Sequence, residues 1–167
     1  MKLLLRYFVC GLTLVCLVTA SLWGAKQLFS LSIATPSEPV KSGVELRLSV
    51  TVTNTSDRTI GFIRSPGLLP EEGYRYEIEV RDAGGHPAPS SAHMRDLKNK
   101  TTATFESNVA RWLKPGESFV DEIDVTKFYD LSQPGKYTIS VARPIPPAQN
   151  LGEGKVKSNS ITVTVVQ

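Results

Sequence analysis

Apolar and polar residues alternate with a period of two through most of the chain after residue 27. The clearest run spans Val44 to Thr53, where five apolar residues alternate with five polar ones. Successive side chains of a β-strand point to opposite faces, so this run predicts a strand with one buried and one solvated face. Similar runs occupy residues 27–33, 59–63, 74–80, 101–106, 109–113, 119–125, 137–141 and 161–165. About eight strands separated by turn signals favour an all-β fold, an antiparallel immunoglobulin-like β-sandwich.

The stretch from Leu113 to Ala142 reads as strand, corner and strand. Residues 129–135 are rich in turn formers, and Tyr137, Ile139 and Val141 then alternate with polar residues. A tyrosine just after such a corner takes the place of the tyrosine corner of immunoglobulin-like sandwiches, in which the ring is buried and the hydroxyl bonds to the corner backbone. We therefore expect Tyr137 to be buried and to organise the fold.

Some segments lack this alternation. His86 to Lys100 is polar, contains proline and shows no period, so it predicts an irregular segment without an amphipathic helix. Arg143 to Lys157 predicts a long exposed loop between the last two strands. We expect Trp112 to be half-buried at a sheet edge, and Asp124 to cap one helical turn.

The N-terminus has the order of a secretory signal, with positive charges at Lys2 and Arg6, then an apolar run, then small residues. Two outcomes are open. Cleavage near Val18–Ala20 is favoured, because the uncharged run Phe8–Ala25 only approaches the length of a membrane-spanning helix; otherwise residues 7–25 form an anchor. Either way, residues 1–25 direct export, and residues 26–167 form one sandwich domain in a periplasmic or extracellular compartment.

The charge and the cysteines exclude several classes of function. The net charge of +3 falls to +1 without Lys2 and Arg6, because 19 − 2 = 17 basic residues then face 16 acidic ones. A balance so close to neutral predicts no nucleic-acid surface. Both cysteines, Cys10 and Cys16, lie in the leader, so the domain has no disulfide and no thiol nucleophile.

Candidate metal ligands are few. His86 and His93 flank a loop with Asp82 and Asp96, but their spacing fits no zinc motif, and solvated histidines are favoured.

Three acids, Asp121, Glu122 and Asp124, could supply oxygens for calcium with Asp130 nearby, yet the EF-hand spacing is absent. Alternation places Asp121 on the apolar side of its strand, where a charge needs a partner.

Catalytic motifs are missing as well. No serine lies in Gly-x-Ser-x-Gly, and no glycine-rich phosphate loop is present. We therefore expect no enzyme activity, no metal and no cofactor. Asn54-Thr55-Ser56 and Asn99-Lys100-Thr101 match the glycosylation acceptor pattern.

Five short fragments, in this order, resemble the non-catalytic immunoglobulin-like domain of deuterolysin-type zinc peptidases and bacterial relatives of the intracellular proteinase inhibitor type. They are 52–56 (VTNTS), 78–82 (IEVRD), 113–118 (LKPGES), 129–132 (YDLS) and 134–137 (PGKY). The similarity covers residues 28–166. Its motifs are turns and corners, so they imply fold better than function. The peptidase chemistry needs His-Glu-x-x-His, which this chain lacks, so no catalytic residue is implied.

These observations predict an exported, non-enzymatic β-sandwich that binds another protein or belongs to a cell-envelope assembly. The end loops are the expected contact surface, because the polyproline-like segment there has little entropy to lose on docking. The candidate contact residues are Arg143, Pro144, Ile145, Pro146 and Pro147. The alternative is a peptidase inhibitor that presents Arg143–Asn150 to an active site.

Overall fold

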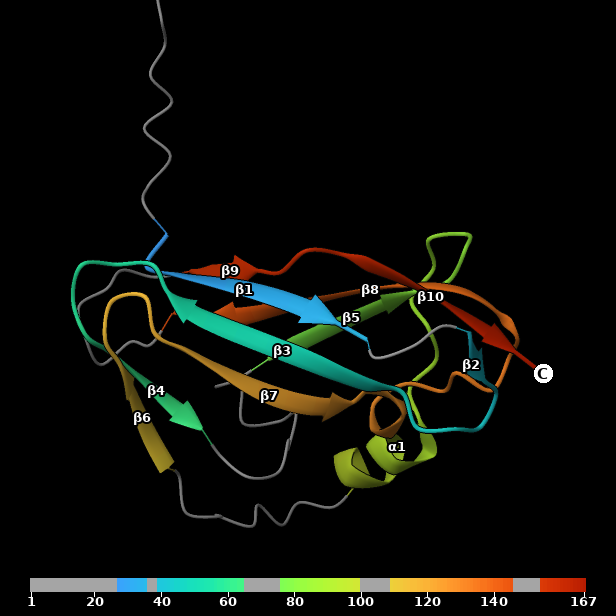
Figure 1. Ribbon diagram of the computed structural model, residues 1–167. Coiled ribbons are helices and arrows are strands. Elements are labelled where there is room, and N and C mark those ends of the chain that lie inside the picture. Colours follow the sequence, from blue (N-terminus) through green and yellow to red (C-terminus); the bar gives the residue numbers. More distant parts are fainter. Residues whose placement is uncertain (1–26, 36–38, 65–75, 100–108, 146–153) are drawn as a thin grey trace, which may run out of the picture.

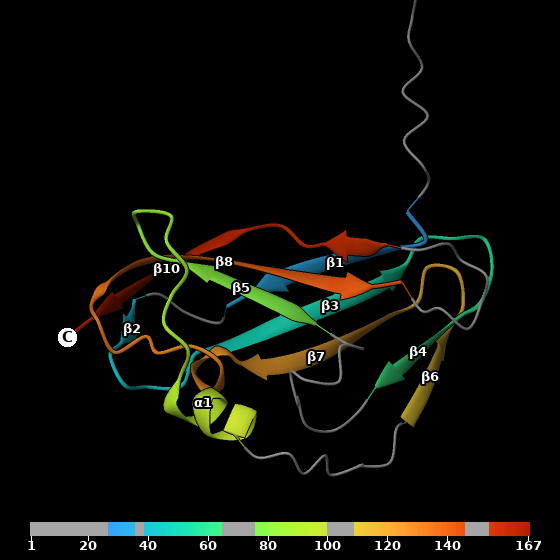
Figure 2. The ribbon, with the colours of Figure 1, turned by 180° about the vertical axis from the view of Figure 1, so that it is seen from behind.

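The computed structural model describes residues 27–35, 39–64, 76–99, 109–145 and 154–167, which form a mainly antiparallel β-structure in two layers (Figures 1 and 2). This confirms the all-β, mainly antiparallel part of the predicted fold class. The predicted leader or anchor helix, the strand at 101–106 and the contact residues Pro146 and Pro147 lie outside the described residues. No helix within the described ranges has the length and apolar character needed to cross a bilayer.

The first layer is a three-stranded sheet, and the second is a larger sheet facing it. The first has the order β1-β3-β7, and the second the order β2-β10-β8-β5, with β9 also paired to β8. A two-stranded ribbon, β4-β6, extends one end of the first layer (Figure 1). The bounds are β1 Phe29–Ala34, β2 Val40–Lys41, β3 Arg47–Asn54, β4 Ile60–Arg64, β5 Glu77–Arg81, β6 Val109–Leu113, β7 Ser118–Asp124, β8 Gly135–Pro144, β9 Lys155–Lys157 and β10 Ile161–Val166.

One continuous core fills the space between the layers, built from the inward positions of both sheets. In β3 the fully buried residues are Leu48, Val50 and Val52, and in β8 they are Ile139 and Val141. Strand alternation thus produces the core that the sequence predicts. The strand expected from Val44 begins only at Arg47, however, and Val44 is 53% exposed.

The tyrosine corner is confirmed. The Tyr137 side chain is 6% exposed, and its hydroxyl donates a hydrogen bond of 2.9 Å to the carbonyl of Gln133, four residues back in the corner. Burial raises the pKa of the Tyr137 phenol, so it stays protonated as a donor. Leu131 inside the corner is also buried. The corner is therefore held both by packing and by a side chain bond to its own backbone.

The prediction of an irregular segment without a helix after β5 is wrong. Residues Ala92–Asn99 form a helix, α1, where the sequence predicted an irregular segment. Ser91 caps it, because its hydroxyl accepts a 3.1 Å bond from the backbone N–H of Met94. In addition, β2 pairs with β10 in parallel, so the sandwich is not purely antiparallel.

The helical turn predicted after Asp124 is confirmed as a 3-10 helix, Val125–Lys127. The Asp124 carboxylate accepts a 3.0 Å bond from the backbone N–H of Thr126. This carboxylate therefore serves as a cap.

The two described ends of the segment from Arg143 to Lys157, which was predicted as a loop, continue the sheet. Strand β8 runs to Pro144, and β9 pairs with it, with Arg143 opposite Val156. The backbone N–H of Ile145 then bonds to the carbonyl of Gly154, at 2.9 Å. The base of this connection is a β-hairpin, and the sequence pattern was hidden because β9 is only three residues long.

Asn159, in the segment that connects β9 and β10, joins the two layers along one side. Its side chain accepts a 2.9 Å bond from the N–H of Ile33 and donates a 3.1 Å bond to the carbonyl of the same residue. It thus pairs with β1 as a backbone unit of a neighbouring strand would, and covers an edge that would otherwise offer free groups.

Asn54 fixes the junction between the first sheet and the β4-β6 ribbon. It is 1% exposed, and its amide nitrogen donates to the carbonyls of Arg58 and Leu113, at 2.7 and 2.9 Å. Its amide oxygen accepts from the backbone and hydroxyl of Ser56, at 2.9 and 2.7 Å. The glycosylation pattern at Asn54 thus falls on a buried amide with no room for a glycan in this fold.

Replacing Tyr137 by phenylalanine keeps the ring and removes the hydroxyl. We expect Y137F to lower the free energy of unfolding by about 1 kcal/mol, the usual net worth of one hydrogen bond. Urea unfolding followed by circular dichroism measures the change. An unchanged midpoint would show that packing alone holds the corner.

Replacing Asn159 by alanine removes both bonds to Ile33. We expect N159A to cost about 1–2 kcal/mol of unfolding free energy and to raise amide exchange in β1 more than in β8. Hydrogen exchange with mass readout tests this, with the neighbouring S160A as a control of little effect. Equal protection of β1 in both variants would contradict the role given to Asn159.

Candidate functional site

The predicted contact residues that the structure describes, Arg143, Pro144 and Ile145, differ in how far they are buried. Arg143 is 2% exposed and points into the core, so it contributes no side chain to the surface. Pro144 is half-buried at the end of β8, and Ile145 is a half-buried residue packed against the core. The expectation that Arg143 lies on an exposed loop is thus wrong, because the alternation that buries Ile139 and Val141 continues to position 143.

Three aromatic rings surround the Arg143 guanidinium. Its central carbon lies 4.8 Å from the ring centre of Tyr76, 5.3 Å from that of Phe62 and 5.7 Å from that of Phe119. A cation over the face of such rings is attracted by their quadrupoles, more strongly where water is excluded. The rings come from β4, β7 and the residue before β5, so this one side chain contacts three separate segments of the chain.

Asp121 shares this polar interior. It lies on the inward side of β7, between Phe119 and Ile123, and accepts a 2.8 Å hydrogen bond from the Tyr76 hydroxyl. Burial strongly raises the pKa of Tyr76; the positive charge of Arg143 opposes this rise, and the negative charge of Asp121 adds to it. Both charged groups thus act on the same phenol, which explains how a carboxylate is tolerated on the apolar face.

The outer side of the same cluster carries an exposed tryptophan. The exposed guanidinium of Arg111 lies 5.6 Å from the ring centre of Phe119. The adjacent Trp112 is 63% exposed, which corrects the expectation that it is half-buried. Trp112 stands opposite Gly61 in the β4-β6 ribbon, and glycine offers no side chain to cover the indole.

We call this part of the molecule the aromatic end: the β4-β6 ribbon, the base of the β8-β9 hairpin, and the turns at residues 54–59 and 114–117. These segments lie together at one end of the sandwich in both views (Figures 1 and 2). Beneath them, Phe29, Phe62 and Phe119 pack edge to face, with ring centres 5.2 and 5.6 Å apart. The aromatic end thus combines a rigid interior with an exposed indole.

The residues weighed for metal binding are dispersed. Among the described residues no three histidine, cysteine or acidic side chains are grouped so that they could hold a metal ion. His86 lies 3.4 Å from Asp82 in an exposed turn, and a hydrogen bond from the backbone N–H of His86 is the main cause that lowers the pKa of Asp82. His93 and Asp96 lie exposed on α1.

The acids weighed for calcium have separate partners. Asp121 accepts from Tyr76, Glu122 lies 3.7 Å from Arg47, and Asp124 caps the 3-10 helix. Asp130 accepts a 3.0 Å bond from the backbone N–H of Ser132. These four carboxylates serve separate parts of the fold.

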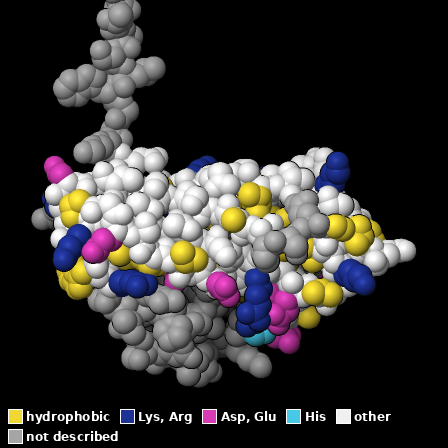
Figure 3. Space-filling model, in the orientation of Figure 1, with side chains coloured by type: hydrophobic (Ala, Val, Ile, Leu, Met, Phe, Trp, Pro, Cys, Tyr) yellow, Lys and Arg dark blue, Asp and Glu magenta, His cyan; other side chains and the backbone are white. Residues whose placement is uncertain are grey.

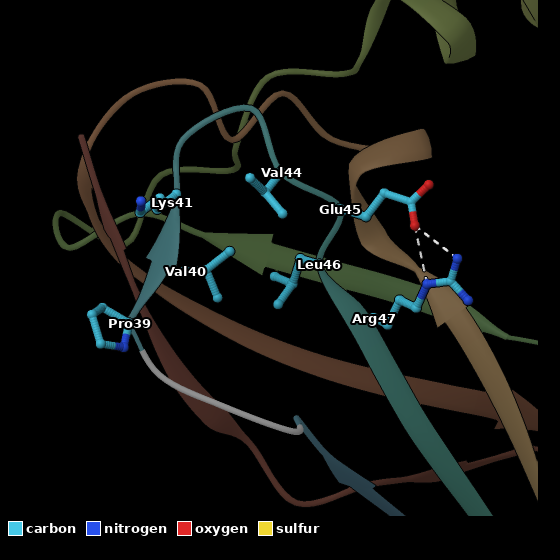
Figure 4. A pocket seen from close by; sticks show the side chains of 7 residues that line it. All are labelled: Pro39, Val40, Lys41, Val44, Glu45, Leu46 and Arg47. Carbon is cyan, nitrogen blue, oxygen red and sulfur yellow. Dashed lines mark hydrogen bonds and ion pairs between the residues drawn. The ribbon is translucent and has the colours of Figure 1, made fainter.

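A small pocket lies at the other end of β3 (Figure 4). Its volume is about 210 Å³, and Val40, Val44 and Leu46 form its apolar part. The Glu45 and Arg47 side chains at its side bond to each other at 2.8 Å (Figure 4). The hydrogen bond to Glu45, and the charge of that carboxylate, raise the pKa of Arg47, so the guanidinium stays charged. No serine, threonine, cysteine or histidine is among the described residues that line the pocket.

The outer face of the first sheet offers little to an apolar partner. In this view the apolar side chains of the described surface are scattered and form no continuous patch (Figure 3). The outward positions of β1 and β3 are mainly hydroxyl residues, namely Ser30, Ser32, Ser49, Thr51 and Thr53. β7 adds Ser118, Glu122 and Val120, which is 50% exposed. Such a face is typical of a solvated sheet.

Comparisons with known proteins show at most a similarity of fold. No family model matches, and no curated protein matches. The chain is similar to the CARDB domain of the PF1109 protein from Pyrococcus furiosus, solved in complex with di-metal ions, at 16% identity, 83% coverage of this chain, 87% of that chain and a TM-score of 0.40. It is similar to the C-terminal domain of wzt at 11% identity, 82% and 71% coverage and a TM-score of 0.47.

A β-glucosidase, EmGH1 from Erythrobacter marinus, matches over 83% of this chain but 15% of that chain, at 17% identity and a TM-score of 0.41. All three TM-scores are below 0.5, so we draw no functional argument from them. The resemblance to deuterolysin-type peptidases and to the inhibitor family stays a prediction.

Replacing Asp121 by asparagine tests the buried network. Asparagine keeps the shape but removes the charge, so we expect D121N to lower the free energy of unfolding by about 1–3 kcal/mol, the range for hydrogen bonds to charged groups. The neighbouring E122Q, on the exposed side of the same strand, should change it by less than about 0.5 kcal/mol. Urea unfolding of both variants measures the difference, and equal effects would contradict the network.

Proposed function

We propose that this protein is an exported, non-catalytic β-sandwich that binds another protein through its aromatic end. The observation that carries the proposal is Trp112, which is 63% exposed in the middle of a paired strand. Tryptophan is among the residues most enriched at the energetic centres of protein interfaces, because it offers a large apolar area with few rotatable bonds.

The surroundings of Trp112 suit a preformed contact surface. The ribbon is paired over five positions, from Ile60–Leu113 to Arg64–Val109. Asn54 ties its base to the first sheet, and Phe62 on its inner side is fully buried. A side chain on such a support loses little conformational freedom on binding, so more of its buried area contributes to affinity.

The β8-β9 hairpin belongs to the same proposed surface. Its base is fixed by the pairing of Pro144 with Lys155 and by the Ile145–Gly154 bond. Pro144 and Ile145 are half-buried, which leaves each with some exposed area beside the ribbon. Export rests on the charge and apolar pattern of residues 1–25, which also provides the one membrane contact that we propose, if the segment is uncleaved.

Peptidase inhibition is the weaker alternative. It would have to rest on residues other than Arg143, because that side chain is 2% exposed and cannot enter an active site in this fold. The proposed protein-binding module needs no side chain that enters an active site, and it uses the exposed Trp112.

Replacing Trp112 by serine tests the proposal. We expect W112S to leave the unfolding midpoint nearly unchanged, because little of the indole is buried, and to weaken partner binding about thirtyfold, since truncating a central interface residue costs about 2 kcal/mol or more. The measurement is quantitative capture from the native envelope fraction by immobilised wild-type and variant protein, followed by titration of the recovered partner.

The matched control is V44S, which removes an apolar side chain of comparable exposure, 53%, at the opposite end of β3. Wild type and V44S should retain the same partner, and W112S should lose it. Retention of the same proteins by all three would overturn the role of Trp112.

A further inference from the structure

We infer that Arg143 is a positioning residue for the aromatic end: its buried guanidinium holds the β4-β6 ribbon, and with it Trp112, against the rest of the sandwich. This inference rests on the proposed function, since it explains how the surface that presents Trp112 is kept rigid.

The first argument is the position of Arg143 in the chain. It lies at the far end of β8, opposite Val156 of β9, and thus belongs to the second sheet. Its guanidinium nevertheless reaches the rings of Phe62 on β4 and Phe119 on β7, at 5.3 and 5.7 Å. One side chain therefore joins the sheet that carries the hairpin to the ribbon and to the strand that leads out of it.

The second argument is the arrangement around Phe119. Two guanidinium groups approach its ring at similar distances, the buried Arg143 at 5.7 Å and the exposed Arg111 at 5.6 Å. Arg111 directly precedes Trp112 in β6. The contacts Arg143–Phe119–Arg111 thus run from the core to the strand that displays the indole.

Strand pairing alone gives the β4-β6 ribbon little stability. The ribbon is a separate two-stranded sheet, and among the described residues neither β4 nor β6 pairs with any further strand. Isolated two-stranded ribbons are marginal in water, so this one depends on side chain packing against the sandwich. Besides the Asn54 bond to Leu113 at its base, the inner residues Ile60, Phe62 and Leu113 supply that packing, and the Phe62 ring contacts Arg143.

The test is hydrogen exchange of the full chain carrying R143M, which keeps a long apolar stem and removes the guanidinium. We expect exchange in peptides covering residues 60–64 and 109–113 to rise about tenfold, with little change in β1 and β3, because the lost contacts are local to the ribbon. R143K retains the charge without the planar group, and should restore part of the protection.

Y137F serves as the matched control, because it weakens the same strand β8 at its other end. It should not raise exchange selectively in the ribbon. If R143M raised exchange evenly in all strands, or left the ribbon as protected as in wild type, the positioning role would be overturned.

The measurement is made without any partner, so its result is independent of whether the proposed binding exists. Loss of ribbon protection in R143M combined with unchanged capture by W112S would refute the proposed function and leave the positioning role intact. The reverse pair of results would refute the positioning role alone.

Discussion

The alternation of side chains along β8 is the constraint on which the rest of the structure depends. Tyr137, Ile139, Val141 and Arg143 are all buried on the same face of this ten-residue strand. Because side chains alternate with a period of two, residue 143 must also face the core once the other three residues do. The strand thus carries a charge into the interior, and the surrounding rings are the means by which that charge is accommodated.

The two ends of β8 are held in place by different chemistry. At the first end a neutral hydroxyl, that of Tyr137, bonds to the carbonyl of Gln133 within its own corner, so the interaction is local. At the second end the Arg143 cation reaches across the core to β4 and β7. Breaking a buried charge network leaves uncompensated charge, and is therefore costlier than losing one neutral bond. Losing one charged group at the aromatic end should therefore cost more stability than losing the Tyr137 hydroxyl at the corner.

Much of the fold could be predicted from the sequence, because alternation is a local property. The buried faces of β1 and β3, the corner at Tyr137 and the cap at Asp124 each follow from residues within a few positions of one another. The missed elements lack such a signal. Strands β2 and β9 have two and three residues, too few for a period, and α1 is an eight-residue helix in a polar segment.

The candidate site was harder to predict, because it depends on contacts between distant residues. Tyr76 and Asp121 are 45 positions apart, and nothing near either one indicates the bond between them. The one available signal was a carboxylate at an inward position of β7, which required a partner without identifying it. Arg143 carried a similar signal, since extending the alternation of β8 by one step would have placed it inside, but the prolines that follow suggested a loop.

Strand β8 continues to Pro144, although a proline often ends a strand because it lacks a backbone donor. This continuation affects how the aromatic end is built. Pro144 lacks an N–H group, yet it stands at the last position of the strand, opposite Lys155, where the cost of a missing donor is small. The N–H of the next residue, Ile145, resumes the pairing with Gly154. Because pairing continues on both sides of the proline, the alternation of β8 holds through Arg143, and its side chain faces the core. The proline that suggested an exposed loop is therefore compatible with an inward-facing cation immediately before it.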